Sequence, residues 1–183
     1  VMYLNTSDCP DATAAGTRIE MSQAQKNWVA ETLIDLNTKA DAGEWKILIL
    51  SHVPLDYASA NIAADILLAY VNGGSYNSYS FAANSAQIIG NCHGHMHCFN
   101  VGYLADKVVR WCTPNSCYIL NNHYKSNTGM SAWSDTTTYA KTAGSGKDTA
   151  FSIVTIDLDS GMCYVDNYGA GIDREFSCDY HTP

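Results

Sequence analysis

Of the 183 residues of this chain, 46% are hydrophobic, 11% aromatic and 15% charged, a composition typical of a folded globular protein rather than a disordered one. Ten basic against eighteen acidic residues give a formal net charge of −8, which argues against a direct electrostatic grip on nucleic-acid phosphates. No uninterrupted apolar stretch approaches the roughly 18 residues of a membrane-spanning helix, so we expect no membrane span. The length suits one domain, residues 1–183.

The first half of the chain predicts alternating strands and helices. Val1–Asn5 is apolar enough for a short strand, and Ser22 opens a Ser-x-x-Gln capping box that predicts a helix ending near Ala40. The nearly continuous apolar run 45–50 is typical of a strand buried on both faces of a layered α/β domain. A second helix is predicted over residues 58–72, where apolar residues recur at helical spacing.

Residues 86–90 predict a further strand, and beyond them the pattern changes to short apolar runs separated by turn residues. These runs predict antiparallel strands at Phe99–Leu104, Lys107–Trp111, Cys117–Leu120, Phe151–Leu158 and Met162–Asn167. The residues Asp159-Ser160-Gly161 predict a hairpin turn between the last two strands. Residues 121–147 are rich in Ser, Thr, Asn and Gly and predict a long surface loop.

The seven cysteines leave the oxidation state of the chain open. An odd number cannot all pair within one chain, and no Cys-x-x-Cys pair is present, which argues against a zinc ribbon and a thioredoxin-type motif. One or two disulfides stay open as an alternative, and the residues Asn5-Thr6-Ser7 fit a glycosylation sequon. Neither feature decides a cellular compartment.

Four of the six histidines follow the two predicted central strands. His52 comes shortly after the first of these strands, and His93, His95 and His97 come shortly after the second. Ligands of α/β sheets gather beyond the carboxyl ends of the strands, and neutral imidazole is a common ligand of zinc, manganese and iron. A lone histidine there is ordinarily a hydrogen-bonded polar residue, and a short histidine-rich tract can bind metal without function. The grouping of all four nevertheless favours a metal site.

Two segments resemble the last two sequence motifs of the calcineurin-like metallophosphoesterases. They are Ser51-His52-Val53-Pro54, in which a histidine closes a buried strand, and Gly94-His95-Met96-His97, a Gly-His-x-His motif. The surroundings resemble that family too, because residues 21–28 are similar to its helix before the first of these strands and residues 149–175 to its closing strands. The resemblance covers most of the chain, and the order of its motifs makes it more specific than Gly-His-x-His alone.

The resemblance implies a layered αββα fold, in which two packed β-sheets are flanked by helices and a two-metal site lies at the strand ends. By position, His52 and His95 would bind one divalent metal ion and His97 the other, the ions being manganese, iron, zinc or similar. The two ions would hold a hydroxide that attacks the phosphorus of a phosphate ester in line. Metal charge, rather than Lys or Arg, would then meet the anionic substrate, in agreement with the acidic chain.

Four further residues are weaker candidates for the same site: His93, Gly94, Asp56 and His123. Gly94 permits a close backbone approach and unusual torsions. His93 could contact substrate or support a metal ligand, although a surface imidazole is the preferred interpretation. Asp56 follows the Ser-His-Val-Pro loop and His123 follows a predicted strand, and for both an ordinary surface or packing role ranks above a functional one.

The upstream motifs of the family, Asp-x-His, Gly-Asp-x-x-Asp and Gly-Asn-His, are absent in family order. In the family they supply the bridging aspartate, an asparagine ligand and the histidine thought to protonate the leaving group. Partial matches at residues 90–93 and 179–181 lie in the wrong place and are interpreted as chance. We therefore expect the C-terminal half of a phosphoesterase domain, with partial or empty metal sites and little or no turnover as an isolated chain. It should retain the missing N-terminal half as a partner or self-associate.

Two other functions stay open. The missing aspartates fit a non-catalytic binding or interaction module with a degenerate phosphoesterase fold. A single-zinc protein that uses His95, His97 and a cysteine is a weaker alternative, because the spacing matches no known zinc module. The flanking Cys92 and Cys98 are instead interpreted as small buried residues. Monoester, diester, nucleotide and lipid phosphates all suit such a site, so no substrate is predicted.

Overall fold

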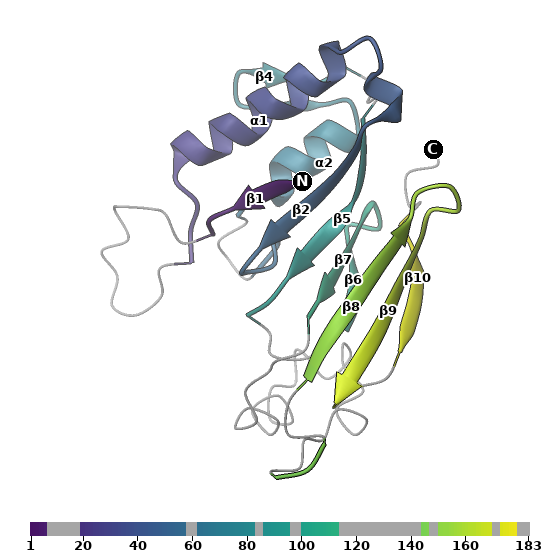
Figure 1. Ribbon diagram of the computed structural model, residues 1–183. Coiled ribbons are helices and arrows are strands. Elements are labelled where there is room, and N and C mark those ends of the chain that lie inside the picture. Colours follow the sequence, from purple (N-terminus) through teal and green to yellow (C-terminus); the bar gives the residue numbers. More distant parts are fainter. Residues whose placement is uncertain are drawn as a thin grey trace.

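The computed structural model of the chain describes residues 1–6, 19–57, 62–82, 86–95, 100–113, 144–146, 150–169 and 173–178. Two helices, a short 3₁₀ turn and ten strands form a mixed α/β arrangement in these residues (Figure 1), as predicted. In chain order they are β1 (Met2–Leu4), α1 (Gln23–Thr38), η1 (Ala42–Glu44), β2 (Lys46–Ser51), α2 (Ala64–Val71), β3 (Ser75–Tyr76), β4 (Tyr79–Ser80), β5 (Gln87–His93), β6 (Asn100–Leu104), β7 (Val108–Cys112), β8 (Ala150–Asp157), β9 (Met162–Gly169) and β10 (Arg174–Ser177).

The central sheet has five strands in the order β1-β2-β5-β7-β6. β1, β2, β5 and β7 run parallel, and β6 returns antiparallel to β7. The prediction that β7 belongs to an antiparallel set is therefore right for one neighbour and wrong for the other, because β7 pairs in parallel with β5. Since four strands share one direction, their carboxyl ends meet along one edge of the sheet.

Both helices cover the same face of this sheet (Figure 1). The sequence pattern of α1 and α2 places apolar side chains at three- and four-residue spacing, which gives each helix one apolar stripe. These stripes are buried against β2 and β5 in the larger apolar core. The buried side chains of the two helices are Val29, Ala30 and Leu33 in α1 and Ala64, Ile66, Leu67 and Tyr70 in α2.

The start of α1 shows half of the predicted capping box. The Ser22 hydroxyl accepts a hydrogen bond from the backbone N–H of Gln25 at 3.2 Å, as an N-cap should. The Gln25 side chain turns toward Asn5 instead of back toward the cap. It accepts from the Asn5 N–H at 2.8 Å and donates to the Asn5 carbonyl at 2.9 Å. Gln25 therefore ties the helix start to the end of β1.

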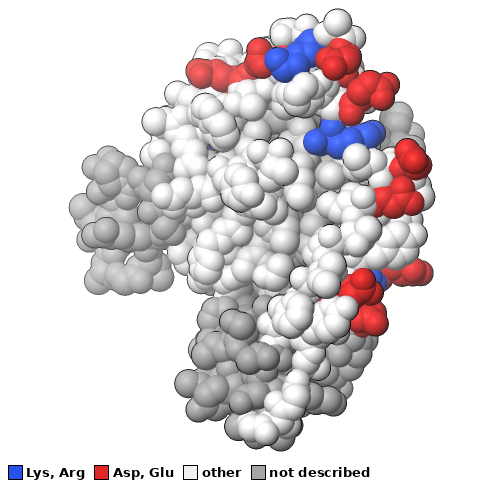
Figure 2. Space-filling model, in the orientation of Figure 1, with Lys and Arg blue, Asp and Glu red and all other residues white. Residues whose placement is uncertain are grey.

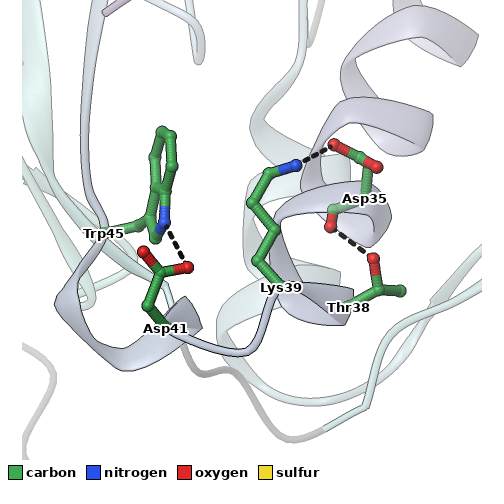
Figure 3. A network of polar contacts seen from close by, with 5 residues as sticks. All are labelled: Asp35, Thr38, Lys39, Asp41 and Trp45. Carbon is green, nitrogen blue, oxygen red and sulfur yellow. Dashed lines mark hydrogen bonds and ion pairs between the residues drawn. The ribbon is translucent and has the colours of Figure 1, made fainter.

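Polar contacts shape the turn between α1 and β2 (Figure 3). The Lys39 ammonium lies 3.0 Å from an Asp35 carboxylate oxygen and 5.9 Å from the centre of the Trp45 ring. The Trp45 indole N–H donates to the Asp41 carboxylate at 3.1 Å, and the Thr38 hydroxyl donates to the Asp35 carbonyl at 2.7 Å. The helix ends at Thr38, two residues before the predicted Ala40. These contacts set the path of the chain into β2.

The second helix is shorter than predicted. α2 begins at Ala64 rather than residue 58, and the preceding Ile62 and Ala63 are buried without being helical. Residues 58–61 lie outside the described part of the chain, as do the predicted strand 117–120 and most of the predicted loop 121–147. Among the helices that the structure describes, none is long and apolar enough to span a membrane.

A second, antiparallel sheet has the strand order β10-β9-β8. The predicted hairpin turn joins β8 to β9, with Gly161 in the left-handed region at a φ of 66°. Asp157 caps this turn, because its carboxylate accepts from the N–H of Asp159 at 2.9 Å and from the hydroxyl of Ser160 at 2.6 Å. These hydrogen bonds hold the pKa of Asp157 below its ordinary value.

The two sheets pack face to face around a second apolar core. The central sheet contributes Ile89, Val109 and Trp111, and the second sheet contributes Cys163, Val165, Phe176 and Cys178. The order of layers is therefore helices, central sheet, second sheet (Figure 1). The outer face of the second sheet exposes Phe151, Ile153, Tyr164 and Tyr168, and in the described residues no helix covers it.

Candidate functional site

The carboxyl ends of β2 and β5 bring two of the predicted metal ligands together. Ser51 of β2 pairs with His93 of β5 in parallel register, so the next residues, His52 and Gly94, leave the sheet side by side. The Gly94 N–H donates to the His52 carbonyl at 3.0 Å and extends the pairing by one step. The chain then reaches His95 directly beside His52.

The imidazole rings of His52 and His95 meet edge to face. Their centroids are 5.4 Å apart and their planes make an angle of 79°. The ring of Tyr57 is also edge-on to His95, with centroids 4.8 Å apart, so His95 has an aromatic contact besides His52. His52 is exposed and His95 is half-buried.

His95, rather than Gly94, carries the unusual backbone conformation. The φ of His95 is 64°, in the left-handed region that costs a residue with a β-carbon roughly 1–2 kcal/mol. Gly94 is not among the described glycines with a positive φ, and a β-carbon there would lie 3.5 Å from His52 Nδ1, an ordinary contact. Gly94 therefore uses neither the close approach nor the unusual torsion that a glycine permits. The left-handed residue turns the chain away from the strand direction immediately after β5.

A β-bulge in β5 decides which way its last side chains point. The register of β5 against β2 shifts between Ile47 and Leu48, which leaves Ile89 as the extra residue. Ile89 and Cys92 both face the core between the sheets although they are an odd number of residues apart. Strict alternation would place them on opposite faces. Simple alternation counted from the start of β5 therefore gives the wrong face for His93. The bulge turns His93 and the other residues after it to the opposite face.

His93 is buried under the site, so the interpretation of a surface imidazole is wrong. Only 2% of the residue is exposed, and its Nδ1 lies 3.0 Å from the Gly94 carbonyl. Burial lowers the pKa of His93 to about 4, helped by the positive charge of Arg110 and by His95 and His52, while the Gly94 carbonyl opposes the shift. His93 is therefore neutral at pH 7. A Nδ1–H donor to Gly94 leaves Nε2 as the ring acceptor, and this atom has no partner among the described residues.

Arg110 is a buried charge beside the site that the sequence interpretation overlooked. Its Nε lies 3.4 Å from a carboxylate oxygen of Asp56, and the exposed fractions of the two side chains are 5% and 29%. Burial lowers the pKa of Arg110, and the Asp56 charge opposes that shift. The available signal was an arginine inside the otherwise apolar strand β7, where a charge needs a partner. Asp56 thus supplies the carboxylate that faces this buried arginine.

A second polar group braces the loop after β2. The Asn91 side-chain amide donates to the Ser51 hydroxyl at 3.0 Å, and that hydroxyl donates to the Val53 carbonyl at 2.8 Å. The Val53 N–H in turn donates to the Thr6 hydroxyl at 3.2 Å. Three neighbouring strand ends thereby share one hydrogen-bond chain, which holds His52 at a defined place.

Several predicted residues lie outside the part of the chain that the structure describes. They are His97, His123 and the segment 179–181, together with Cys98. Within the described residues, no three His, Cys, Asp or Glu side chains come together in a way that could hold a metal ion. Cys92 is half-buried among the residues of the second core, and burial raises the pKa of its thiol to about 11, so its interpretation as a packing residue fits its position. Two imidazoles, His52 and His95, are thus the described part of the predicted ligand set.

Scans of protein-family models, of curated proteins and of solved structures found no match to this chain.

Proposed function

We propose that this chain contributes the histidine ligands of a metal-dependent phosphoesterase with a two-metal site. The observation that carries the proposal is the pair of facing imidazoles at the carboxyl ends of two neighbouring parallel strands, with ring centroids 5.4 Å apart. In this proposal His52 and His95 bind one divalent ion and His97 binds the other. When bound, such ions supply positive charge for the phosphate and lower the pKa of the attacking water.

The surroundings of the imidazoles suit ligand chemistry. A histidine binds a metal ion through its neutral imidazole. His93 stays neutral because it is buried, so it adds no positive charge that would repel a cation. Arg110 is positive but is paired with Asp56 on the buried side of the site. Of these two buried groups, His93 is neutral and Arg110 is paired, which favours a cation beside His52 and His95.

The charge distribution supports metal ions, rather than basic side chains, as the phosphate-binding groups. The chain carries a formal net charge of −8. Acidic side chains lie along the upper and right edges of the face shown in Figure 2, with basic side chains among them, and the centre of that face, as far as the structure describes it, is uncharged. A phosphate ester would meet net repulsion unless cations were bound.

The proposed site needs further ligands, including a bridging carboxylate. We propose that these ligands come from an N-terminal half that joins this fold, with helices outside both sheets. The alternative is that a second copy of the chain covers the surfaces that such a half would cover. Two apolar surfaces of the described residues support this. One is the exposed outer face of β8 and β9, and the other is a 190 Å³ groove beside the edge strand β1, lined by Val1, Trp28, Leu36 and Trp45 among others.

The experiment is metal-dependent phosphate binding and hydrolysis. Inorganic phosphate is titrated into the chain by calorimetry with Mn²⁺ or Zn²⁺ present, and hydrolysis of p-nitrophenyl phosphate and of its bis-ester is followed in parallel. We expect saturable phosphate binding that disappears with chelator and in a His52→Ala, His95→Ala double variant, with little turnover from the isolated chain. Phosphate binding that survives both treatments would overturn the proposal.

One observation favours a second candidate, a non-catalytic binding module. Asp56, four residues beyond His52 in the chain, is already paired with Arg110. A module of this kind would bind one metal ion, or none, and would bind no phosphate through it. The same titration separates the two candidates, because only the phosphoesterase site predicts that phosphate binding depends on the metal.

A further inference from the structure

Two buried cysteines face each other at one end of the second sheet. Cys163 lies in β9, and Cys178 is the residue after β10. Their exposed fractions are 0% and 2%, and both belong to the core between the sheets. Pairing of these two thiols involves none of the proposed metal ligands, so it is independent of the proposed function.

The strand register places the two side chains on the same face. Cys163 pairs with Phe176, and Cys178 is two residues beyond Phe176, which returns its side chain to the inner face. The Cys178 N–H donates to the Gly161 carbonyl at 2.7 Å and continues the ladder past β10. The end of the chain is therefore held against β9 where Cys163 points inward.

The two thiols are close enough to influence each other's charge state. A side-chain hydrogen bond with Cys178, followed by burial, raises the pKa of the Cys163 thiol well above its ordinary range. Cys92 is another described thiol close enough to affect Cys163, but it lies in β5 of the central sheet, whereas Cys178 follows the strand that pairs with β9. Of the cysteines that the structure describes, Cys178 is thus the better placed partner for Cys163.

We propose that Cys163 and Cys178 form a structural disulfide that fastens the short strand β10 to β9. A disulfide needs two cysteines whose side chains approach one another, and this pair lies in diagonal positions on the inner face of adjacent strands. A cross-link here restricts the unfolded chain and secures a four-residue edge strand that covers the core with Phe176.

The bond forms by exchange with a low-molecular-weight disulfide such as oxidised glutathione. One cysteine thiolate attacks the small disulfide and releases one small thiol, and the second cysteine thiolate then displaces the other. The sulfur–sulfur bond of the reagent breaks, the bond between Cys163 and Cys178 forms, and the reagent takes up two electrons and two protons. Because both thiols are buried in the fold, we expect the exchange during folding rather than afterwards.

The test is oxidative refolding of the whole chain. The reduced, denatured protein is refolded with mixed reduced and oxidised glutathione, or with reductant alone, then quenched in acid, alkylated, and digested without reduction. Mass spectrometry should show peptides joined through Cys163 and Cys178 after the first treatment and separate alkylated peptides after the second. The thermal midpoint of the oxidised protein should exceed that of the reduced protein by roughly 4–16 °C.

Cys92→Ser is the matched control, because it removes the neighbouring buried thiol and should keep both the linked peptides and the shift in midpoint. A Cys163→Ser, Cys178→Ser double variant should lose the dependence of the midpoint on glutathione. If that variant fails to fold, the peptide maps of the wild type and of Cys92→Ser still decide. Free, alkylated Cys163 and Cys178 after oxidative refolding, or Cys163 joined to Cys92, would overturn the proposal.

Discussion

At the scale of single residues, the site rests on side chains that work in pairs. His52 and His95 meet at the surface, while His93 and Arg110 are buried beneath them. The charge states of the buried His93 and Arg110 act on the imidazoles of His52 and His95. The contributions of His93 and Arg110 to the free energy of unfolding are best measured on the metal-free protein, because metal binding would mask them.

Stability should fall as the pH is lowered, because His93 is buried in its neutral form. Its pKa is about 4 in the folded chain against about 6.5 when unfolded, so between these values the unfolded state binds more protons. The penalty is absent above pH 6.5, grows as the pH falls toward 4, and reaches about 3 kcal/mol. Urea unfolding across this range, with chelator present, measures it.

The matching variant is His93→Asn, whose amide can still donate to the Gly94 carbonyl but does not titrate. Subtracting its stability profile from that of the wild type removes the contribution of the carboxylates. The difference should show the His93 slope between pH 6.5 and 4. Parallel profiles would show that His93 is not a buried neutral base.

Removing the partner of Arg110 should destabilise the fold. Asp56→Asn leaves a buried guanidinium without the carboxylate that faces it at 3.4 Å, and we expect a loss of about 1–3 kcal/mol in the free energy of unfolding. The exposed pair of Asp35 and Lys39 is the control, since Asp35→Asn should cost less than about 1 kcal/mol. Equal losses in the two variants would contradict the buried role of Arg110.

At the scale of secondary-structure elements, most of the framework could be predicted from the sequence. Local patterns sufficed for α1, β2 and the hairpin at residues 159–161, because a cap, a continuous apolar run and a turn sequence are each written in neighbouring residues. The burial of His93 could not be predicted in this way. It depends on the bulge at Ile89, which arises from pairing with β2, a strand distant in the chain.

The other differences between the predictions and the structure also arise from contacts between residues that are distant in the sequence. The pairing of Arg110 with Asp56 joins β7 to a loop distant in sequence, and the parallel pairing of β7 with β5 depends on the assembled sheet. Sequence patterns placed His52 and His95 together correctly because both residues follow strands whose carboxyl ends share an edge. His97 and His123 stay predictions.

Adding a single methyl group at Gly90, directly after the bulge, should destabilise the fold. Gly90 follows the bulge with a φ of 150°, and a β-carbon there would lie 2.4 Å from the Trp111 ring. Gly90→Ala should therefore lower the free energy of unfolding by about 2–5 kcal/mol through backbone strain and overpacking. Gly43→Ala is the control, because nothing lies within 4 Å of the added carbon, and its effect should stay within about 0.5 kcal/mol.

At the scale of the whole molecule, the described helices lie on one side of the two packed sheets. Helices cover the central sheet, whereas the outer face of β8 and β9 exposes Phe151, Ile153 and Tyr168 by 57%, 50% and 48%. Phe151 and Tyr168 stack with ring centroids 4.9 Å apart, and Ile153 beside them pairs with the exposed Asp166, so apolar rings and one carboxylate share this face. A surface of this kind favours association with another polypeptide.

The isolated chain should therefore self-associate in a concentration-dependent way. Sedimentation velocity should show larger species whose fraction falls when Phe151 and Ile153 are replaced by Ser and Thr. Leu158→Ser serves as the control, because Leu158 is 56% exposed but lies just beyond the end of β8. A purely monomeric wild type across the accessible concentrations would contradict the prediction.

The central claim is that His52 and His95 bind the same metal ion. The most direct measurement is calorimetric titration of Zn²⁺ or Mn²⁺ into the chain, purified without a histidine tag, for the wild type and for single His52→Ala, His95→Ala and His181→Ala variants. The account predicts that each of the first two substitutions weakens binding by at least about tenfold and that His181→Ala leaves it unchanged. Affinities unchanged by His52→Ala and His95→Ala would contradict it.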